Sequence, residues 1–494
     1  MPLNLSNRDQ NSGHLFYNRR LRAAITRFSV RMKHDDRKQQ AALALSAVFV
    51  VVTCGWMALL AAIKPAGLVG QAAIVGNRDT GAVFARVDGR LHPAMNLTSA
   101  RLVTGSSNAP VWVKSGEIAK HPTGPMVGIP GVADELSLSA NPMSAWAVCD
   151  TTAARGGGSG PTVTAIAGQL SGSGRAAPMR EDQALFVSHR GATYLVWNGR
   201  RSRIDIADRA VVFNLGLDLT HTHPIEVSTA LFDAMPATEP LVVPAVPGAG
   251  GSSGLLPGAA VGTVLATRDA TGSVNRFYVL LANGVQQITP FVADLLRAAD
   301  SHGSTAPQVI APDTLLRLRE TEQLRVDFYP AGRLAFIDTA ASPVTCVSWT
   351  KGSTDPRAEV KVLSGRGLPS PESEDRRIVG LIGTDHGPDS VEAQQALVLP
   401  NAANFVAATT GGAVGDTREG LFWVSAQGVR YGIDRDRATL SALEIDPARA
   451  VQAPWPILRI FAAGPAIDRD DALLERDSIV PETPGQTLLT NEGG

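Results

Sequence analysis

The chain has 494 residues and a formal net charge of -1, with 44% apolar and 18% charged residues. This length predicts several folded domains rather than one core. The first forty residues carry nine Lys and Arg against three Asp and Glu, which leaves a net charge of about -7 on the remainder. Aromatic residues make up only 5%, and the body shows no basic patch with interleaved aromatics, which excludes a nucleic-acid-binding protein.

The basic segment 1–40 contains HLFYNRRLRAAITRFSVRM (14–32), whose spacing predicts an amphipathic helix. Apolar residues recur on one face of this helix, namely Leu21, Ala24, Ile25, Phe28 and Met32. Arginines supply the rest of its surface, namely Arg19, Arg20, Arg22, Arg27 and Arg31. Such a helix either lies on anionic lipid or docks onto cytoplasmic partners, and the sequence leaves both interpretations open.

Residues 41–63, AALALSAVFVVVTCGWMALLAAI, contain no charge. As a helix they are about 35 Å long, enough to cross a bilayer, so we expect a transmembrane helix here. The preceding flank is basic, whereas the first twenty residues after the helix contain only two basic residues, Lys64 and Arg78. The positive-inside rule therefore places the N-terminus in the cytoplasm and the remainder outside. A cleaved signal peptide is the alternative, but its n-region is too long and no A-x-A site follows.

Three cysteines occur in the chain, and Cys54 lies in the apolar segment. Cys149 and Cys346 lie in similar strand-like stretches, SAWAVCD and TCVSWTK. An oxidising compartment favours pairing them over two free buried thiols. The bridge closes a loop of roughly two hundred residues, worth at most about 4–5 kcal/mol in the chain-entropy model.

Four segments share one pattern, namely 83–102, 193–212, 277–296 and 421–440. Each begins with an aromatic residue on an alternating strand, reaches a glycine turn, and continues with a return strand and a capped helix start. The turn glycines are Gly89, Gly199, Gly284 and Gly428. The aromatic-to-glycine spacing is five residues in three copies and six in the third, which predicts an insertion in that copy.

The segments inserted after the first and third copies predict one shared central β domain, closed by Cys149 and Cys346. The expected fold class is therefore α+β: a single N-terminal transmembrane helix, then an elongated exported region of four small β-hairpin/helix repeats around a central β-rich core. Glycine-rich stretches at 154–161 and 247–258 predict flexible joints. The predicted parts are a basic helix segment (1–40), a transmembrane helix (41–63), repeat 1 (64–138), the first part of the core (139–180), repeat 2 (181–250), repeat 3 (251–333), the second part of the core (334–414), repeat 4 (415–478) and a flexible tail (479–494).

Chemical motifs are weak. LSGRGLP (363–369) lacks the lysine and hydroxyl of a phosphate loop. GGSSG (250–254) matches G-x-S-x-G but lies in a predicted joint. His221 and His223 are too few to form a metal site, and we expect the Asp residues in AIDRDD (466–471) and the Asn96 sequon to cap helices. We therefore predict no catalytic, cofactor-binding or metal-binding residue.

The chain resembles the EccB component of the mycobacterial type VII (ESX) secretion system. The residues that carry the resemblance include GHLFYNRRLRAAITRFSVRM, IVGNRDTGAVFARVDGRLHPAMNLTSARLVTG, PMVGIPG, WAVCD, GRRSRIDIADRAVV, ALFDAMPATEPL, NGVQQITPFVADLL, LPNAANFVA and FAAGPAIDRDDALLERD. The resemblance implies a single-pass inner-membrane protein with a cytoplasmic N-terminus and a periplasmic body of four repeats around a disulfide-closed core. It also implies assembly with the EccC motor ATPase, EccD and EccE, and proximity to the mycosin protease.

Members of that family are also labelled ATPases, and their repeats resemble cell-wall-binding modules. No nucleotide motif of the family matches this sequence. The family label is therefore the one reason to consider ATP, and we expect no cofactor. Three functions follow: a structural subunit of the secretion complex, which we favour, an ATPase within it, or a peptidoglycan-binding tether. Expected contacts are the other subunits, a second copy in the periplasm and membrane lipid, without nucleic acid.

Overall fold

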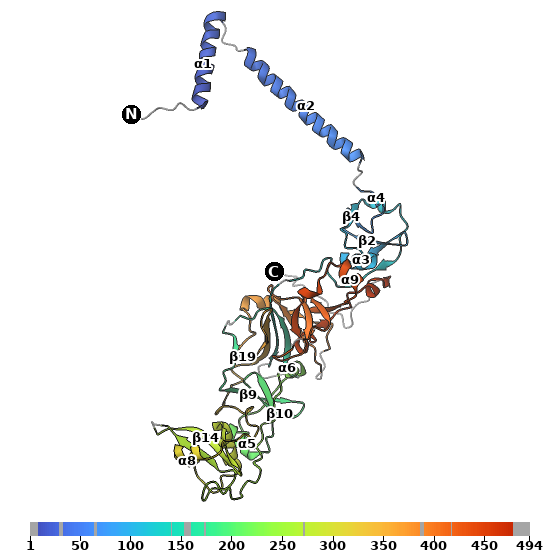
Figure 1. The fold of residues 1–494 in the computed structure, drawn as a ribbon. Coiled ribbons are helices and arrows are strands. Elements are labelled where there is room, and N and C mark those ends of the chain that lie inside the picture. The colour runs from blue at the N-terminus through green and yellow to red at the C-terminus, as the bar shows by residue number, and fades with distance from the viewer. Residues whose placement is uncertain are drawn as a thin grey trace, which may run out of the picture.

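The computed structural model begins with two helices and continues into a β-rich body (Figure 1). It describes residues 8–28, 33–63, 67–139, 141–152, 160–171, 174–269, 272–385, 390–415 and 417–477. The predicted tail 479–494 lies outside these residues, as does most of the predicted joint 154–161. The second predicted joint, 247–258, is folded back on itself: the Gly250 N–H donates to the Val261 carbonyl at 2.9 Å, and the Val261 N–H to Gly251 at 2.7 Å.

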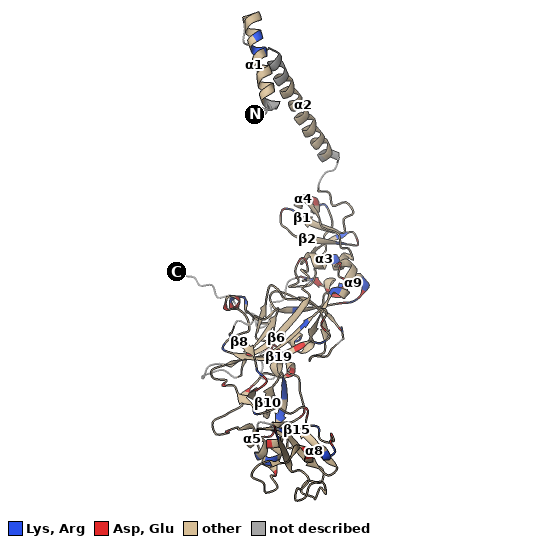
Figure 2. Ribbon diagram, turned by 60° about the vertical axis from the view of Figure 1, so that its left-hand side comes forward, with Lys and Arg blue, Asp and Glu red and all other residues tan. Residues whose placement is uncertain are grey.

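The N-terminal part contains α1 (Arg8–Arg27) and α2 (Lys33–Ile63). α1 ends at Arg27, and Phe28 after it takes a left-handed φ of 49°; residues 29–32 of the helix predicted over 14–32 lie outside the described residues. α2 includes the whole predicted apolar segment and starts two turns before it. Its residues Gln40–Leu60 form the candidate membrane span, with a mean hydropathy of 2.3 and no residue buried. Figure 2 shows basic residues along α1 and an uncharged length of α2.

Four sheets of the body each start with three consecutive antiparallel strands. We call these regions the first (74–127), second (183–241), third (264–324) and fourth (405–467) units. Their strands are β1 (Ile74–Asn77), β2 (Val83–Val87) and β3 (Arg90–Ala94); β9 (Gln183–His189), β10 (Ala192–Trp197) and β11 (Arg200–Ile204); β13 (Val264–Arg268), β14 (Val274–Leu281) and β15 (Gly284–Ile288); β22 (Phe405–Thr409), β23 (Leu421–Val424) and β24 (Val429–Ile433).

Each triplet is followed by a helix whose N-cap side chain accepts a backbone N–H: Asn96, Asp208, Thr289 or Asp436. A short strand then pairs parallel to the first strand of the triplet, and a second short helix follows. The elements are α3 (Leu97–Thr104), β4 (Val111–Val113) and α4 (Ser115–Ile118); α5 (Arg209–Leu215), β12 (Ile225–Glu226) and α6 (Thr229–Ala234); α7 (Pro290–Ala299), β16 (Gln308–Val309) and α8 (Pro312–Arg317); α9 (Arg437–Ala442), β25 (Val451–Pro454) and α10 (Trp455–Leu458).

Short strands and turns complete these units. β5 (Met126–Val127) runs parallel to β3, and β26 (Ala462–Ala463) runs parallel to β24. Near the C-terminus, α11 (Arg469–Ala472) packs on α3, and β27 (Glu475–Arg476) pairs with β5, so the chain returns to its first unit. Outside the central sheet, the other described elements are β17 (Ala335–Phe336), which pairs with β9, and two 3₁₀ turns, η1 (Glu372–Arg377) and η2 (Pro447–Arg449).

The first two hairpins turn as the sequence predicts. Asp88 and Gly89, like Asn198 and Gly199, both have positive φ, as a two-residue type I′ turn requires. In the third hairpin the turn is Ala282-Asn283, because Leu281 pairs with Gly284. Gly284 is therefore a strand residue, and a Cβ there would lie 2.2 Å from the carbonyl oxygen of Arg319.

The predicted insertion in the third copy is wrong. Tyr278 stands four positions before the first turn residue, as Phe84 and Tyr194 do, so the first three hairpins have one geometry. The fourth hairpin differs instead, because its last strand pair, Val424 and Arg430, encloses a longer loop. The longer spacing arose because Gly284 is not a turn residue: a glycine is needed there because the Arg319 backbone lies close to it. A sequence pattern alone cannot distinguish such a glycine from a turn glycine.

A seven-stranded sheet lies between the units, with strand order β20-β21-β7-β6-β18-β19-β8. Its strands come from both predicted parts of the core: β6 (Met143–Thr151), β7 (Thr162–Ala167), β8 (Ala176–Pro178), β18 (Val344–Gly352), β19 (Glu359–Gly365), β20 (Val379–Gly380) and β21 (Gln395–Val398). The predicted boundary at 414 is one strand late, because β22 belongs to the fourth sheet and not to the central one. The aromatic hairpin pattern marks only the second strand of a unit, so the first strand was assigned to the core.

Apolar packing joins the units in nested pairs. α5 packs on α7, and the second and third units share one cluster that includes Leu195 and Val292. α3 packs on α9, and the first and fourth units share another cluster that includes Leu102 and Trp423. The first and third units consequently lie at opposite ends of the body (Figure 1). The central sheet thus carries two arms, one made of units 1 and 4 and one made of units 2 and 3.

The disulfide between Cys149 and Cys346 is present, and it links β6 to β18. The two cysteines are direct cross-strand partners, with Cα atoms 4.0 Å apart, and both are fully buried. Because 197 positions separate them, the bond closes a loop that contains the whole second and third units.

Removal of this bond should destabilise the body. The double substitution Cys149→Ala with Cys346→Ala should lower the free energy of unfolding by about 2–5 kcal/mol, because the unfolded chain gains the entropy of the opened loop. Urea denaturation of the full-length protein in detergent measures the effect. Cys54→Ala, in α2, is the control and should leave the midpoint unchanged. An unchanged midpoint in the double variant would contradict the stabilising role.

Candidate functional site: the central joint

The two arms meet over one face of the central sheet, where α6 of the second unit packs on α10 of the fourth. We call this region the central joint, and it consists of β6, β18, α6 and α10. Its core contains Trp146, Val347, Leu231, Leu458 and Phe461, all nearly inaccessible to solvent. The rings of Trp146 and Phe461 meet edge to face, with centroids 5.8 Å apart. The disulfide lies in a separate apolar cluster on the opposite face of the sheet.

A buried carboxylate fastens the second unit to the sheet. Asp150, the residue after Cys149, accepts hydrogen bonds from the N–H and the hydroxyl of Ser228 at 2.7 and 2.6 Å. Ser228 is the N-cap of α6, and its hydroxyl also accepts the Leu231 N–H. Burial raises the pKa of Asp150 to about 7, although the Ser228 hydrogen bonds act in the opposite direction. Asp150 is the one charged residue of β6, which is the sequence signal for a buried contact, and no role was predicted for it.

Polar contacts also fasten the fourth unit to the sheet. The Ser144 hydroxyl donates to the Gln452 carbonyl at 2.6 Å, and the Lys351 ammonium donates to the Gln452 side chain at 2.7 Å. The Trp349 indole N–H donates to the Gly412 carbonyl at 2.9 Å. Both strands of the central pair, β6 and β18, therefore hold the fourth unit.

The two arms also contact each other directly. The Arg459 guanidinium, just after α10, pairs with Asp233 of α6 at 2.5 Å. Two arginines have matching places on the third strands of the second and fourth units. Arg201 donates to the Phe232 carbonyl at 3.0 Å and stacks on its ring, and Arg430 donates to the Phe461 carbonyl at 3.3 Å. Arg201 thus holds α6 itself, and Arg430 holds the chain just after α10.

This arrangement holds the two arms together. The joint is filled by apolar side chains, and its buried carboxylate is occupied by Ser228. Two arms held by hydrogen bonds, an ion pair and a packed core keep a defined angle. The central joint therefore sets the shape of the body.

The predicted arginines of the basic segment lie apart from this joint. Arg19, Arg20, Arg22 and Arg27 are on α1, which exposes most of its length to solvent. Arg31 lies outside the described residues. The helix keeps a mixed surface of arginine and exposed apolar side chains such as Leu15, Tyr17 and Ile25, as expected for contact with lipid or with another helix.

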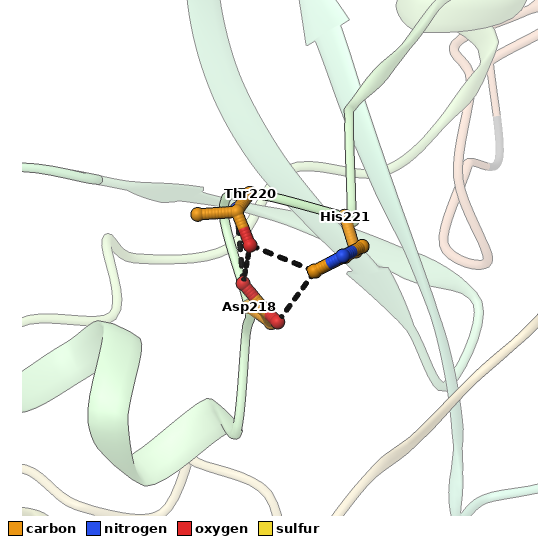
Figure 3. Close-up of polar contacts among 3 residues, drawn as sticks. All are labelled: Asp218, Thr220 and His221. Atoms are coloured by element: carbon orange, nitrogen blue, oxygen red, sulfur yellow. Dashed lines mark hydrogen bonds and ion pairs between the residues drawn. The ribbon is translucent and has the colours of Figure 1, made fainter.

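The predicted histidine pair does not form a metal cluster among the described residues. His221 instead contacts Asp218 and Thr220 in an exposed turn (Figure 3). Its Nδ1 lies 2.8 Å from Asp218 Oδ2 and 2.7 Å from the Thr220 hydroxyl. In a catalytic triad the carboxylate and the hydroxyl bind opposite ring nitrogens, whereas here both meet Nδ1. The trio therefore stabilises a turn, and the Thr220 hydroxyl, followed by His221, lowers the pKa of Asp218 to about 2.

The string LSGRGLP has a packing role. A Cβ on Gly365 would lie 1.9 Å from the Arg175 carbonyl oxygen, which accepts the N–H of Arg366 at 2.7 Å. Arg175 also forms a two-pronged ion pair with Asp375 at 2.9 and 2.8 Å. The glycine is needed so that β19 can approach β8, and the loop cradles a backbone rather than a phosphate. Asn96 and Asp468 cap α3 and α11, as the sequence predicts.

Comparison with known proteins gives consistent matches over the whole chain. Residues 3–481 match the family model described as type VII secretion system ESX-1, transport TM domain B. The chain is 60% identical over 489 residues to the ESX-2 secretion system ATPase EccB2 of Mycobacterium tuberculosis, covering 99% of this chain and 98% of that protein. It is 37% identical over 497 residues to the ESX-5 secretion system ATPase EccB5 of the same species, covering 99% and 97%.

Solved structures agree with this result. One is a chain from an intact ESX-5 inner membrane complex, with a TM-score of 0.77, 36% identity and 99% coverage of both chains. Another is a chain of an EccB3 dimer from the ESX-3 core complex, with a TM-score of 0.70, 35% identity and coverage of 82% of this chain and 100% of that one.

The buried carboxylate predicts a specific pH dependence. Asp150 keeps its proton up to about pH 7 when folded but loses it near pH 3.9 when unfolded, so the free energy of unfolding should fall as pH rises from about 4 to 7. Asp150→Asn should flatten this slope, which thermal melts of the full-length protein between pH 4.5 and 8.5 measure. Asp218→Asn is the control, because its pKa of about 2 lies below this window. An unchanged slope in Asp150→Asn would contradict the assignment.

Proposed function

This chain belongs to the EccB family of type VII (ESX) secretion, and from that premise we propose that it is a structural subunit of an ESX inner-membrane complex. The observation that carries the proposal is the match over 99% of both chains to a subunit of an intact ESX-5 inner membrane complex. The rigid two-armed body and the single candidate span agree with such a role. The family resemblance noted from the sequence is confirmed.

Localisation follows from the charge pattern. We infer that α2 crosses the inner membrane once, with α1 in the cytoplasm and the body in the periplasm. The basic segment before α2 and the sparse charge after it support this orientation. The buried disulfide supports an oxidising compartment for the body.

The partners proposed for the chain are the other subunits of the same system: the EccC motor ATPase, EccD, EccE and the mycosin protease. Self-association in the periplasm is part of the proposal, and its support is the EccB3 dimer among the similar structures. The arginine-bearing surface of α1 would contact lipid or a cytoplasmic domain of a partner.

We also propose that the four units are copies of one module around the central core. Their support is a shared order of elements: three antiparallel strands, a capped helix, a strand parallel to the first, a short helix, and a segment beside the third strand. Such copies offer several related surfaces on one rigid body.

ATP hydrolysis is the second candidate, and it is favoured by the ATPase label of the curated relatives. A stoichiometric binding assay with ATP and the purified full-length protein separates the two functions. Saturable binding of one ATP per chain would favour the enzyme, and no binding would leave the structural role. A peptidoglycan-binding tether is the third candidate, and it is tested by sedimentation of the protein with insoluble cell wall.

The structural role predicts co-migration with a large complex. Gently solubilised membranes that contain a tagged copy should show the protein in a megadalton band on a native gel. Arg459→Glu should weaken this band by placing two carboxylates together at the joint between the arms. Arg180→Glu, in an exposed ion pair outside the joint, is the control. Migration of the wild-type protein alone would contradict the proposal.

The orientation predicts a protease pattern. Protease added outside spheroplasts should remove nearly everything after Lys64 and leave a small fragment with α1 and α2. A tag at the N-terminus should survive, whereas a tag at the C-terminus should disappear. The reverse pattern would overturn the assigned orientation.

A further inference from the structure

In three of the four units the outer edge of the third strand is covered by the segment that leaves the second short helix. The segment first forms backbone hydrogen bonds of 2.8–3.1 Å with one residue of the third strand. This residue is Leu91 in β3, Arg201 in β11 and Arg430 in β24. It then bonds the strand a second time, because the Leu241 N–H donates to the Arg203 carbonyl at 2.9 Å and the Ile467 N–H to the Gly432 carbonyl at 2.7 Å. The edge is therefore closed by an extended, parallel segment.

The covering segments share a chemical pattern. The residue four positions after the first contact is aliphatic and buried, namely Val127, Leu241 or Ile467. A proline stands one or two positions before it, as in TGPMV (123–127), TEPLV (238–242) and AGPAI (463–467). Proline favours the extended backbone that such pairing requires and removes a competing donor.

The third unit makes only the first of these contacts. The Val285 N–H donates to the Arg319 carbonyl at 2.8 Å, and the Thr321 N–H donates to the Val285 carbonyl at 2.9 Å. Beyond this point the segment bonds the side chain of Gln286 and not the backbone of β15. Its Oε1 accepts the N–H groups of Gln323 and Leu324 at 2.8 and 2.7 Å, and its Nε2 donates to the Leu324 carbonyl at 2.6 Å.

The buried Gln286 amide acts as a spacer that holds this segment away from β15. Because alternate residues of a strand face the same edge, Gln287 has the place that Arg203 and Gly432 have in their units. Its carbonyl receives no hydrogen bond from residues 320–324, all of which the structure describes. A groove of about 810 Å³ opens beside this edge, and its lining includes Phe277, Gln287, Ile288, Leu324, Val326 and Ala331.

The rim of the groove is acidic. Glu320, Glu322 and Asp327 line it, against Arg276 and an Arg325 that is already paired with Glu239 of the second unit. An apolar floor with carboxylates above it favours a segment that carries both aliphatic and basic side chains.

We propose that this groove binds an extended polypeptide segment of aliphatic and basic character, which adds to β15 as a parallel strand. The bound segment makes with Gln287 the contact that Leu241 makes with Arg203 in the second unit. The three closed units identify the occupant as a strand, because the same edge is covered in that way in each of them. The inference concerns one surface of the third unit and stands apart from the proposed role in secretion.

A peptide titration tests the proposal. The probe is a fluorescent peptide with the sequence of residues 236–244, PATEPLVVP, carrying Glu239→Lys, and the protein is full-length in detergent. We expect saturable binding and at least severalfold weaker binding of the unmodified peptide, because its glutamate faces the acidic rim. A peptide N-methylated at the leucine keeps its side chains but lacks the N–H for Gln287, and it should bind roughly fivefold more weakly or worse.

Two protein variants locate the site. Ala331→Trp should fill the groove and reduce the affinity at least tenfold, whereas Ala282→Trp, in the exposed turn of the same hairpin, should not change it. Equal melting temperatures of the two variants control for folding. The proposal is overturned by absence of saturable binding at millimolar peptide, by binding that Ala331→Trp leaves unchanged, or by an N-methylated peptide that binds as tightly as the parent. The last comparison uses the wild-type protein, so it decides even where a variant fails to fold.

Discussion

The pairing of β6 with β18 is the constraint on which the rest of the body depends. These strands come from segments about two hundred residues apart, and between them the chain builds the whole second and third units. Nine residue pairs hold the strands in register, and the buried disulfide lies within that register. A slip by one residue would turn the apolar joint toward the disulfide face, so the bond and the alternating pattern support the same register.

The nested packing of the arms follows from this pairing. The central sheet brings the chain ends of both arms together, so the second unit packs on the third while the first packs on the fourth. The C-terminal strand β27 then returns to the first unit and closes that arm by pairing with β5. Each arm is therefore held both by packing between its two units and by contacts at the central joint.

The units resemble one another in their frame and differ at their edges. Capped helices and parallel closing strands recur, whereas Gln286 replaces the closing contact in the third unit. One buried amide is enough for this change, because its three hydrogen bonds satisfy the backbone of Gln323 and Leu324 in place of the third strand. The units can therefore differ at their edges without a change in their shared order of elements.

The sequence by itself determined the elements whose signals are local. The uncharged run at 41–63, the Asn-Gly and Asp-Gly turns and the capping residues Asn96 and Asp468 each depend on neighbours within a few positions. The pairing of Cys149 with Cys346 was also predicted correctly, because the third cysteine, Cys54, lies in the uncharged run. Tertiary structure alone decided that Gly284 is a strand residue beside Arg319, that β22 belongs to the fourth sheet, and that Asp150 meets Ser228. These features depend on close approaches between segments far apart in the chain, and no local periodicity records such distances.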